Sequence, residues 1–195
     1  MESRDFRFGS TIVRYLVDEQ QNVALRLIPV GMESKEQSPW EIPQPDFDPR
    51  ADYTHNWQQG TLVNIHLAHL PIVSPGLTMR SSVIDKSFKF KEQTVETECD
   101  KTTIVTVLKN DDGYGAEHRL TYHNGLRGFE IETVFINESG ADVELDMLSS
   151  FVLDGLSPFQ LTDAPNVYRF HRFMAGWSLE GKHQCPTIED LGLEK

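Results

Sequence analysis

The sequence predicts an all-β fold, an antiparallel β-sandwich (supersandwich) of about ten or more strands, and three observations lead to it. Many segments of strand length are apolar throughout or alternate apolar and polar side chains. Turn-forming residues separate these segments at a spacing of about 8–12 residues, which is typical of sandwiches and barrels. No segment carries a sustained apolar stripe at i, i+3, i+4 and i+7, the pattern that an amphipathic helix needs.

The individual strands follow from apolar runs and from the turns between them. Polar residues 18–21 join the first pair, and Gly113 is available for a positive φ in the turn at 110–113. Residues 138–140 form a further turn. We expect strands at residues 10–17, 22–30, 61–67, 86–98, 101–110, 115–124, 127–137, 142–153, 166–176 and 177–185.

Two of these strands predict how the sheets are buried. Residues 129–135 alternate apolar or threonine side chains with glutamates, so one face of that sheet should be buried and the other should meet a polar surrounding. The stretch MLSSFVLDGLSPF, residues 147–159, has apolar side chains on both faces of its first half, which predicts a central strand between layers. Gly155 and Pro158 should end that strand in a turn.

Residues 32–57 are the exception to the strand pattern. Four prolines, at positions 39, 43, 45 and 49, exclude a central strand or a helix there. A connection this long inside a compact domain is usually functional or disordered. Its four aromatic residues favour an ordered loop, so we expect one single sandwich domain over 1–195 that carries a long loop at 32–57.

Composition and charge narrow the class of protein. The chain has 195 residues, enough for one domain with a real core. Its 30 acidic and 18 basic residues give a net charge of −12, which argues against a nucleic-acid partner. No apolar run is long enough to span a membrane, and the charged start of the chain does not resemble a signal peptide. We therefore expect a cytoplasmic protein with no membrane partner.

The two cysteines and the histidines do not suggest a metal or redox centre. Cys99 and Cys185 are far apart and lack metal-ligand spacing, and without an export signal we expect reduced thiols. His66 and His69 should point to opposite faces of a strand, and no H-E-x-x-H motif occurs. We expect no metal and no cofactor, with the histidines at partly buried or surface positions.

Hydroxyl and carboxyl groups suggest chemistry only weakly. Ser149 and Ser150 lack the flanking glycines and the following helix of a nucleophile elbow, so strand serines bonded to backbone are the better interpretation. Acid–base hydrolysis of a glycoside needs two carboxyl groups about 5–10 Å apart. The sequence offers many, but most lie in turns and cannot be paired from the sequence: Asp46, Asp48, Asp111, Asp112, Asp154 and Asp163.

Aromatic residues are the remaining signal. Flat rings with polar edges suit sugar rings, but aromatic side chains also dominate sandwich cores. We expect Trp177 in the core, whereas Trp40 and Trp57 in the long loop suit either role.

Three stretches together resemble a known family. Residues 75–96, 101–159 and 163–194 are similar to the N-terminal β-supersandwich of glycoside hydrolase family 36, the bacterial α-galactosidase type. The motifs TMRSS, MLSSFVLDGLSPF and RFMAGWSLEG carry the resemblance and occur in the order found in the family. The likeness runs from about residue 60 to the end of the chain, and residues 1–59 fit only loosely.

The resemblance implies a role as well as a fold. Complete members continue into a (β/α)₈ barrel that supplies an aspartate nucleophile and an aspartate acid/base for retaining hydrolysis. The sequence has no such barrel motif, so no catalytic residue can be transferred and we expect no enzyme activity from this chain alone. It resembles a fragment of such an enzyme, or the product of a shortened gene, that packs against a catalytic barrel or a neighbouring subunit.

The resemblance also motivates a hypothesis for the long loop. In some oligomeric members the sandwich lends a loop to the sugar site of a neighbouring subunit. We expect residues 32–57 to do this for an α-galactoside, with Trp40 or Trp57 stacking on the sugar and Asp46 or Asp48 bonding a hydroxyl. A shortened sandwich should also expose sheet edges, which predicts a homo-oligomer.

Two alternatives stay open at this point. The chain could be a stand-alone, lectin-like sugar-binding sandwich, or, less consistent with its sequence, a small esterase acting through Ser149 or Ser150.

Overall fold

The computed structural model describes residues 2–36, 61–73, 81–153 and 168–192. The chain divides into two compact units, Met1–Leu156 and Ser157–Lys195, and each is described by itself. The described residues form antiparallel sheets with three single-turn 3₁₀ helices and contain no α-helix, which confirms the predicted all-β class. The single domain expected over 1–195 stays a prediction.

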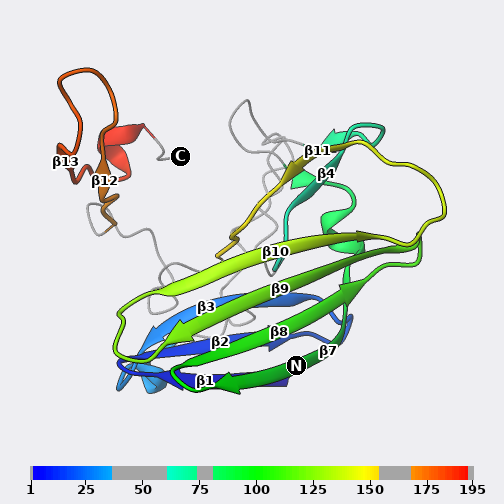
Figure 1. The fold of residues 1–195 in the computed structure, drawn as a ribbon, viewed down its shortest axis with the longest axis horizontal. Coiled ribbons are helices and arrows are strands. Elements are labelled where there is room, and N and C mark those ends of the chain that lie inside the picture. Colours follow the sequence, from blue (N-terminus) through cyan, green and yellow to red (C-terminus); the bar gives the residue numbers. More distant parts are fainter. Residues whose placement is uncertain (1, 37–60, 74–80, 154–167, 193–195) are drawn as a thin grey trace, which may run out of the picture. The chain divides into compact units, whose positions relative to one another are not determined.

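A three-stranded sheet opens the first unit, in the order β1-β2-β3 (Figure 1). Its strands are β1 (Glu2–Phe8), β2 (Thr11–Val17) and β3 (Val23–Pro29). The predicted polar turn joins β2 to β3: the Asp18 carboxylate accepts the N–H groups of Gln20 and Asn22, and Gln21 takes a positive φ of 63°. The sequence analysis missed β1, although Phe6 and Phe8 recur there at the two-residue period of a strand.

The second sheet has four long strands in the order β10-β9-β8-β7. These are β7 (Lys89–Glu98), β8 (Lys101–Lys109), β9 (Tyr114–His123) and β10 (Phe129–Asn137). The β8–β9 turn needs glycine, because Gly113 has φ of 83° and an added Cβ would lie 2.8 Å from Ser139 Cα. The predicted alternation in β10 is confirmed, since Glu130 and Glu132 are exposed whereas Thr133 between the sheets is buried.

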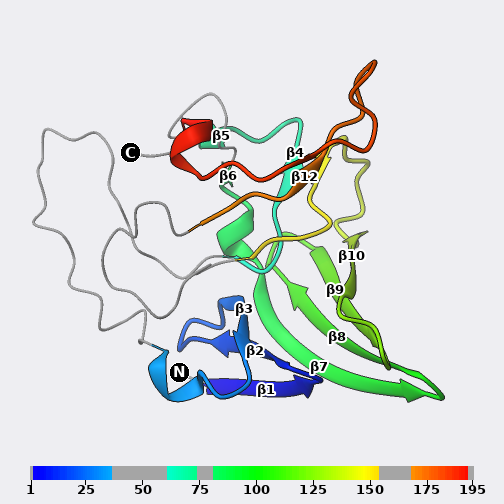
Figure 2. The ribbon, with the colours of Figure 1, turned by 90° about the vertical axis from the view of Figure 1, so that its left-hand side faces the viewer.

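The two sheets pack face to face around one apolar core (Figures 1 and 2). Tyr15 of β2 meets His118 of β9 edge to face, and Phe8 of β1 stacks on Tyr122 of β9 at 4.9 Å between ring centres. The fully buried side chains come from both sheets and from the segment that follows residue 60; the larger of them are Val13, Tyr15, Leu25, Leu62, Val63, Ile65, Leu67, Ile104 and Leu120. Burial of these aliphatic side chains is the main stabilising term of the fold.

Short elements complete the first unit. They are the 3₁₀ turn η1 (Glu33–Lys35), the strands β4 (Ile65–Leu67), β5 (Ile72–Val73), β6 (Ser81–Ser82) and β11 (Leu145–Leu148), and the 3₁₀ turn η2 (Asp85–Ser87). β4 pairs with β11, and β5 with β6. The buried Asp85 carboxylate joins these elements by accepting the N–H groups of Ile65 at 2.7 Å and Ser82 at 3.1 Å. Burial raises the pKa of Asp85, and these two backbone N–H donors oppose that rise.

The central strand predicted at the start of residues 147–159 is wrong. β11 ends at Leu148 and pairs only with β4, and Ser150 and Phe151 are exposed. Both faces of this stretch are apolar, as the prediction assumed. However, β4 has only three residues, so its backbone can form hydrogen bonds with only a short length of β11. The predicted turn at Gly155 and Pro158 lies outside the described residues.

The described part of the second unit is a small hairpin followed by a 3₁₀ turn. Its elements are β12 (Arg172–Phe173), β13 (His183–Gln184) and η3 (Glu189–Leu191), with a bridge between Arg169 and Thr187. Two strands of nine or more residues were expected across 166–185, and the structure corrects them to two residues each. Gly176, Ser178 and Gly181 make residues 176–181 a turn, in which Ser178 and Gly181 have positive φ.

Candidate functional site

The four residues predicted to contact a sugar lie outside the described residues. Trp40, Asp46, Asp48 and Trp57 all fall within 37–60, so their meeting at one site stays a prediction. The structure does describe the sheet residues from which this segment departs and the core residues to which it returns.

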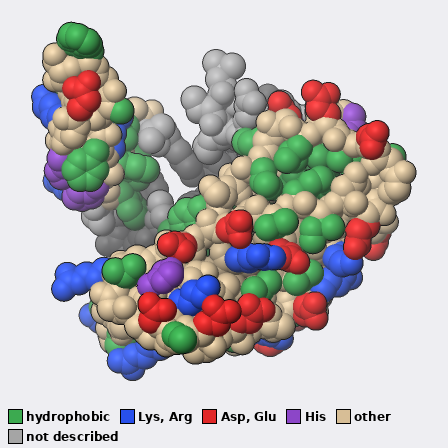
Figure 3. Space-filling view, viewed as in Figure 1, with side chains coloured by type: hydrophobic (Ala, Val, Ile, Leu, Met, Phe, Trp, Pro, Cys, Tyr) green, Lys and Arg blue, Asp and Glu red, His purple; other side chains and the backbone are tan. Residues whose placement is uncertain are grey.

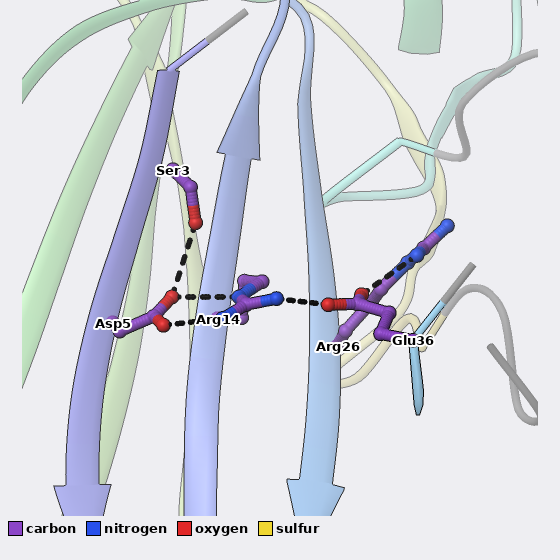
Figure 4. Close-up of polar contacts among 5 residues, drawn as sticks. All are labelled: Ser3, Asp5, Arg14, Arg26 and Glu36. Carbon is purple, nitrogen blue, oxygen red and sulfur yellow. Dashed lines mark hydrogen bonds and ion pairs between the residues drawn. The ribbon is translucent and has the colours of Figure 1, made fainter. Parts of the chain in front are cut away.

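A row of charged side chains crosses the first sheet at the departure point (Figure 4). Arg14 of β2 lies opposite Asp5 of β1 on one side and opposite Arg26 of β3 on the other. The Arg14 Nε–H donates to the Asp5 carboxylate at 2.7 Å, and the Ser3 hydroxyl donates to the same carboxylate at 3.1 Å. The hydrogen bond from Arg14 lowers the pKa of Asp5, and its counterpart raises the pKa of Arg14. Both groups are therefore charged near neutral pH.

Glu36 lies between the two arginines of this row. Its carboxylate accepts a hydrogen bond from Arg26 Nη1 at 2.8 Å through one oxygen and a bond from Arg14 through the other. Two arginines opposite each other on paired strands would repel, and a carboxylate shared between them removes that repulsion. The Glu36 side chain is only 9% exposed and that of Arg26 only 5%, so this is a largely desolvated cluster.

The return point is held by apolar packing. Leu62 and Val63 are fully buried in the core between the sheets, and β4 follows directly. The predicted loop over 32–57 thus has one fixed anchor near its start, the ion cluster at Glu36, and another after its end, the core residues at 62–63. Fixed anchors are what a binding loop needs if it is to present side chains in one place on a rigid scaffold.

A shallow depression offers a second place for a ligand. Its volume is about 430 Å³, and it is lined by Ala68, His69, Tyr114 and residues 141–144. The Ala68 N–H donates to the Glu144 carbonyl at 3.0 Å, which holds the two lining segments together. An aromatic ring beside the carboxylates of Asp142 and Glu144 is chemistry that suits polyhydroxylated ligands.

The hairpin of the second unit presents aromatic side chains to solvent. Trp177 is 93% exposed and Phe173 is 72% exposed, and Phe170 and Leu179 are also exposed. The prediction that Trp177 packs in the core is therefore wrong. The physical reason is that Trp177 lies in the turn 176–181 instead of in a long strand that a second layer covers.

An Asp–His pair was missed by sequence reasoning. His66 Nδ1 of β4 and Asp146 Oδ2 of β11 lie 2.8 Å apart, although the residues are 80 positions apart in the chain. No local motif links them, and only the β4–β11 pairing brings them together. The pair resembles the orienting half of a hydrolytic triad. However, His66 is buried and its Nε2 has no hydrogen-bond partner among the described residues, so that atom is closed to a substrate.

Ser149 and Ser150 follow the end of β11, so the prediction that they are strand serines is wrong, although their backbone groups are hydrogen-bonded. The Ser149 N–H donates to the Asn64 carbonyl, and the Ser150 carbonyl accepts from the Thr133 hydroxyl. Cys99 and Cys185 are free thiols, as the sequence predicts. Within the described ranges, no group of three or more histidine, cysteine or acidic side chains is arranged to hold a metal ion.

Charged side chains of both signs are interspersed over the face of the four-stranded sheet turned to the viewer in Figure 3. Arg119 of β9 pairs with Glu117 at 2.6 Å and lies 3.8 Å from Glu132 of β10. In the part of the chain that the structure describes, no helix is long and apolar enough to cross a membrane.

Comparison with known proteins found no match to this chain among protein-family models, curated proteins or solved structures.

Proposed function

We propose that the chain is a non-catalytic β-sandwich module of an α-galactosidase-type glycoside hydrolase, which works in carbohydrate metabolism in the cytoplasm. It packs against a catalytic barrel or a neighbouring subunit and lends its segment 32–57 to the sugar site. The observation that supports this most directly is a pair of fixed anchors, one at Glu36 near the start of the segment and one at Leu62–Val63 after its end.

The anchors support this role through pre-organisation. A loop whose ends are held loses less conformational freedom when a sugar binds, so more of the contact energy appears as affinity. Trp40 and Trp57 supply the stacking surface, and Asp46 and Asp48 accept hydrogen bonds from sugar hydroxyls. The bond-breaking carboxylates come from the barrel, and the module acts on binding and position alone.

The test is complementation in trans. The full chain is mixed with a separately produced barrel of a family 36 α-galactosidase, and hydrolysis of p-nitrophenyl α-galactoside is followed. We expect a stable complex on size exclusion, with hydrolysis that needs the barrel and rises when the chain is added.

The tryptophan variants test the role of the segment in the sugar site. Trp40→Ala and Trp57→Ala should each raise KM about tenfold, because each removes one stacking contact of about 1.4 kcal/mol. The exposed Lys91→Ala on β7 is the matched control. If neither tryptophan variant changes KM while the complex still forms, the sugar-site role of the segment is wrong; if no complex forms, the module role is wrong.

A second candidate function, stand-alone sugar binding, is favoured by one observation. Trp177 and Phe173 are exposed aromatic side chains on one short hairpin, and such rings stack on the apolar faces of sugars. Titration calorimetry of the full chain with galactose, melibiose and raffinose distinguishes the two. Millimolar or tighter binding that Trp177→Ala removes would support a lectin-like protein, and the absence of heat up to high millimolar sugar would exclude it.

A further inference from the structure

Two histidines and a cysteine lie in series on the hairpin of the second unit. His171 precedes β12, His183 begins β13, and Cys185 follows β13. The Cys185 Sγ lies 3.4 Å from His171 Nε2, and the other ring nitrogen of His171, Nδ1, lies 3.0 Å from His183 Nε2. The two imidazole rings are stacked, with their planes 17° apart. Backbone pairing of Arg172 with Gln184 holds the two strands, and therefore these side chains, in register.

The order of these three groups is that of a nucleophile, a base and a group that orients the base. When His171 carries its hydrogen on Nδ1 and donates it to His183 Nε2, the lone pair of Nε2 faces the thiol. Nε2 can then accept the proton of the Cys185 S–H, and His183 holds the ring of His171 in place while it does so. A thiol, a base within hydrogen-bond reach and a third oriented group are the signature of an activated nucleophile.

Charged side chains of both signs surround the thiol. The described part of this unit, residues 168–192, contains the basic Arg169, Arg172 and Lys182 and the same number of acidic residues, which are Glu180, Glu189 and Asp190. Of these, Asp190 interacts with the charge of Arg169. The Arg169 guanidinium lies against the Cys185 backbone, with Nη1 3.5 Å from the carbonyl oxygen. Cys185 is partly exposed, as a cysteine must be if it is to react with a molecule from solution.

We infer that Cys185 is a nucleophilic thiol, activated by His171 and His183, that exchanges with small-molecule disulfides. His171 Nε2 takes the proton of Cys185, and the thiolate attacks one sulfur of a disulfide R–S–S–R. The S–S bond of the reagent breaks as the Sγ–S bond forms. The leaving thiolate R–S⁻ takes the proton back from His171. Cys185 ends as a mixed disulfide, and one R–SH is released. This inference does not depend on the proposed sugar-related function.

The chain carries its own reference thiol. Cys99 lies exposed in the turn between β7 and β8, with acidic neighbours Glu98 and Asp100 in the sequence. Cys99→Ser leaves Cys185 as the reacting thiol, and Cys185→Ser leaves Cys99. The two thiols differ in exposure, which by itself changes how fast each reacts. For each thiol we therefore compare the ratio of its own rates at two pH values.

The experiment measures reaction with 4,4′-dithiodipyridine, a neutral disulfide, at pH 6 and at pH 9. An ordinary thiol loses roughly two-hundredfold in rate between pH 9 and pH 6, following its thiolate fraction. In the Cys185→Ser variant the reacting thiol is Cys99, and we expect its rate to fall by roughly two-hundredfold or more between pH 9 and pH 6. The Cys99→Ser variant, which reports Cys185, should lose less than about twentyfold. Circular dichroism checks that each variant is folded.

The histidines are tested in the Cys99→Ser background. His171→Gln should restore the steep fall in rate, and His183→Gln should restore it in part, because His183 only orients His171. Incubation of Cys99→Ser with oxidised glutathione should add one glutathionyl group, detected by intact mass. A fall in rate for Cys185 as steep as that for Cys99 would overturn the inference, and so would a His171→Gln variant with an unchanged ratio.

Discussion

His118 lies in an environment that a histidine does not usually prefer. It lies on β9, fully buried between the two sheets, and neither ring nitrogen has a hydrogen-bond partner among the described residues. Its ring meets the edge of Tyr15 at 6.1 Å between centres. Burial lowers the pKa of His118 to about 4, because a charged imidazolium would be desolvated there. The imidazole is neutral at pH 7.

This residue should make the fold sensitive to mild acid. The pKa of His118 is about 4 in the folded state and about 6.5 in the unfolded state, so the unfolded state binds the proton first as pH falls. The effect on stability is zero well above pH 6.5 and grows as pH falls towards 4. Near pH 4, protonation of His118 removes up to about 3 kcal/mol from the free energy of unfolding. This figure corresponds to the difference of roughly two and a half pKa units between the folded and unfolded states. Urea unfolding at pH 7 and pH 4.5 measures it.

His118→Leu is the variant that isolates this effect. Leucine has a similar volume and no polar atom to desolvate, so its stability at pH 7 should equal or exceed that of the original chain. Its loss of stability from pH 7 to pH 4.5 should be smaller by about 2 kcal/mol. His69→Gln, at an exposed position, controls for removal of a histidine. Equal losses in the original chain and in His118→Leu would contradict the assignment.

At the scale of elements, the first sheet is organised by two different patterns on its two faces. The inner face of β2 and β3 carries Val13, Tyr15 and Leu25 into the core. The opposite face carries Arg14 and Arg26, which are directly paired across the strands and share Glu36. Apolar burial therefore holds the first sheet to the second, and the ion cluster holds Glu36, directly after η1, to the first sheet.

Removal of Glu36 should be costly for this element. Glu36→Ala leaves Arg14 and Arg26 facing each other in a desolvated place, and we expect a loss of about 3 kcal/mol in the free energy of unfolding. Chemical denaturation followed by circular dichroism measures this loss. Glu19→Gln, in the exposed β2–β3 turn, should change stability by less than about 0.5 kcal/mol.

A second variant distinguishes the repulsion of the arginines from loss of the Glu36 side chain itself. Arg26→Met combined with Glu36→Met replaces the buried pair by apolar groups of similar length and should recover most of the stability. If the double variant is as unstable as Glu36→Ala, the cluster does not act through its charges.

At the scale of the whole molecule, each unit leaves apolar side chains uncovered. In the first unit, Val95 and Phe151 are exposed; in the second, Phe173 and Trp177 are. The strands that the structure describes in the second unit, β12 and β13, have two residues each. Exposed aromatic side chains on a small unit are typical of surfaces that meet another protein.

We therefore expect the chain to form a dimer or a higher oligomer. Light scattering coupled to size exclusion should give a mass above that of one 22.3 kDa chain at micromolar concentration. Phe173→Ser combined with Trp177→Ser should shift the chain towards the monomer, because aromatic side chains carry much of the energy of such interfaces. Val95→Ser on β7 is the control for a single exposed apolar residue. A monomeric mass for the original chain under these conditions would contradict the prediction.

The sequence by itself determined the class of the fold, the strands of the four-stranded sheet and the turns at Gly113 and Gly140. These features depend on side-chain alternation and on the backbone freedom of single glycines, which are local properties. β1 was missed because its charged residues hide the recurrence of Phe6 and Phe8.

Only the tertiary structure decided the rest. The length of β11, the exposure of Trp177, the His66–Asp146 pair, the ion cluster at Glu36 and the series Cys185–His171–His183 all depend on which strands pair, and with how long a partner. A strand extends only as far as its neighbour provides backbone donors and acceptors, and a side chain is buried only where another layer covers it. Those are properties of residues far apart in the chain, and local pattern does not contain them.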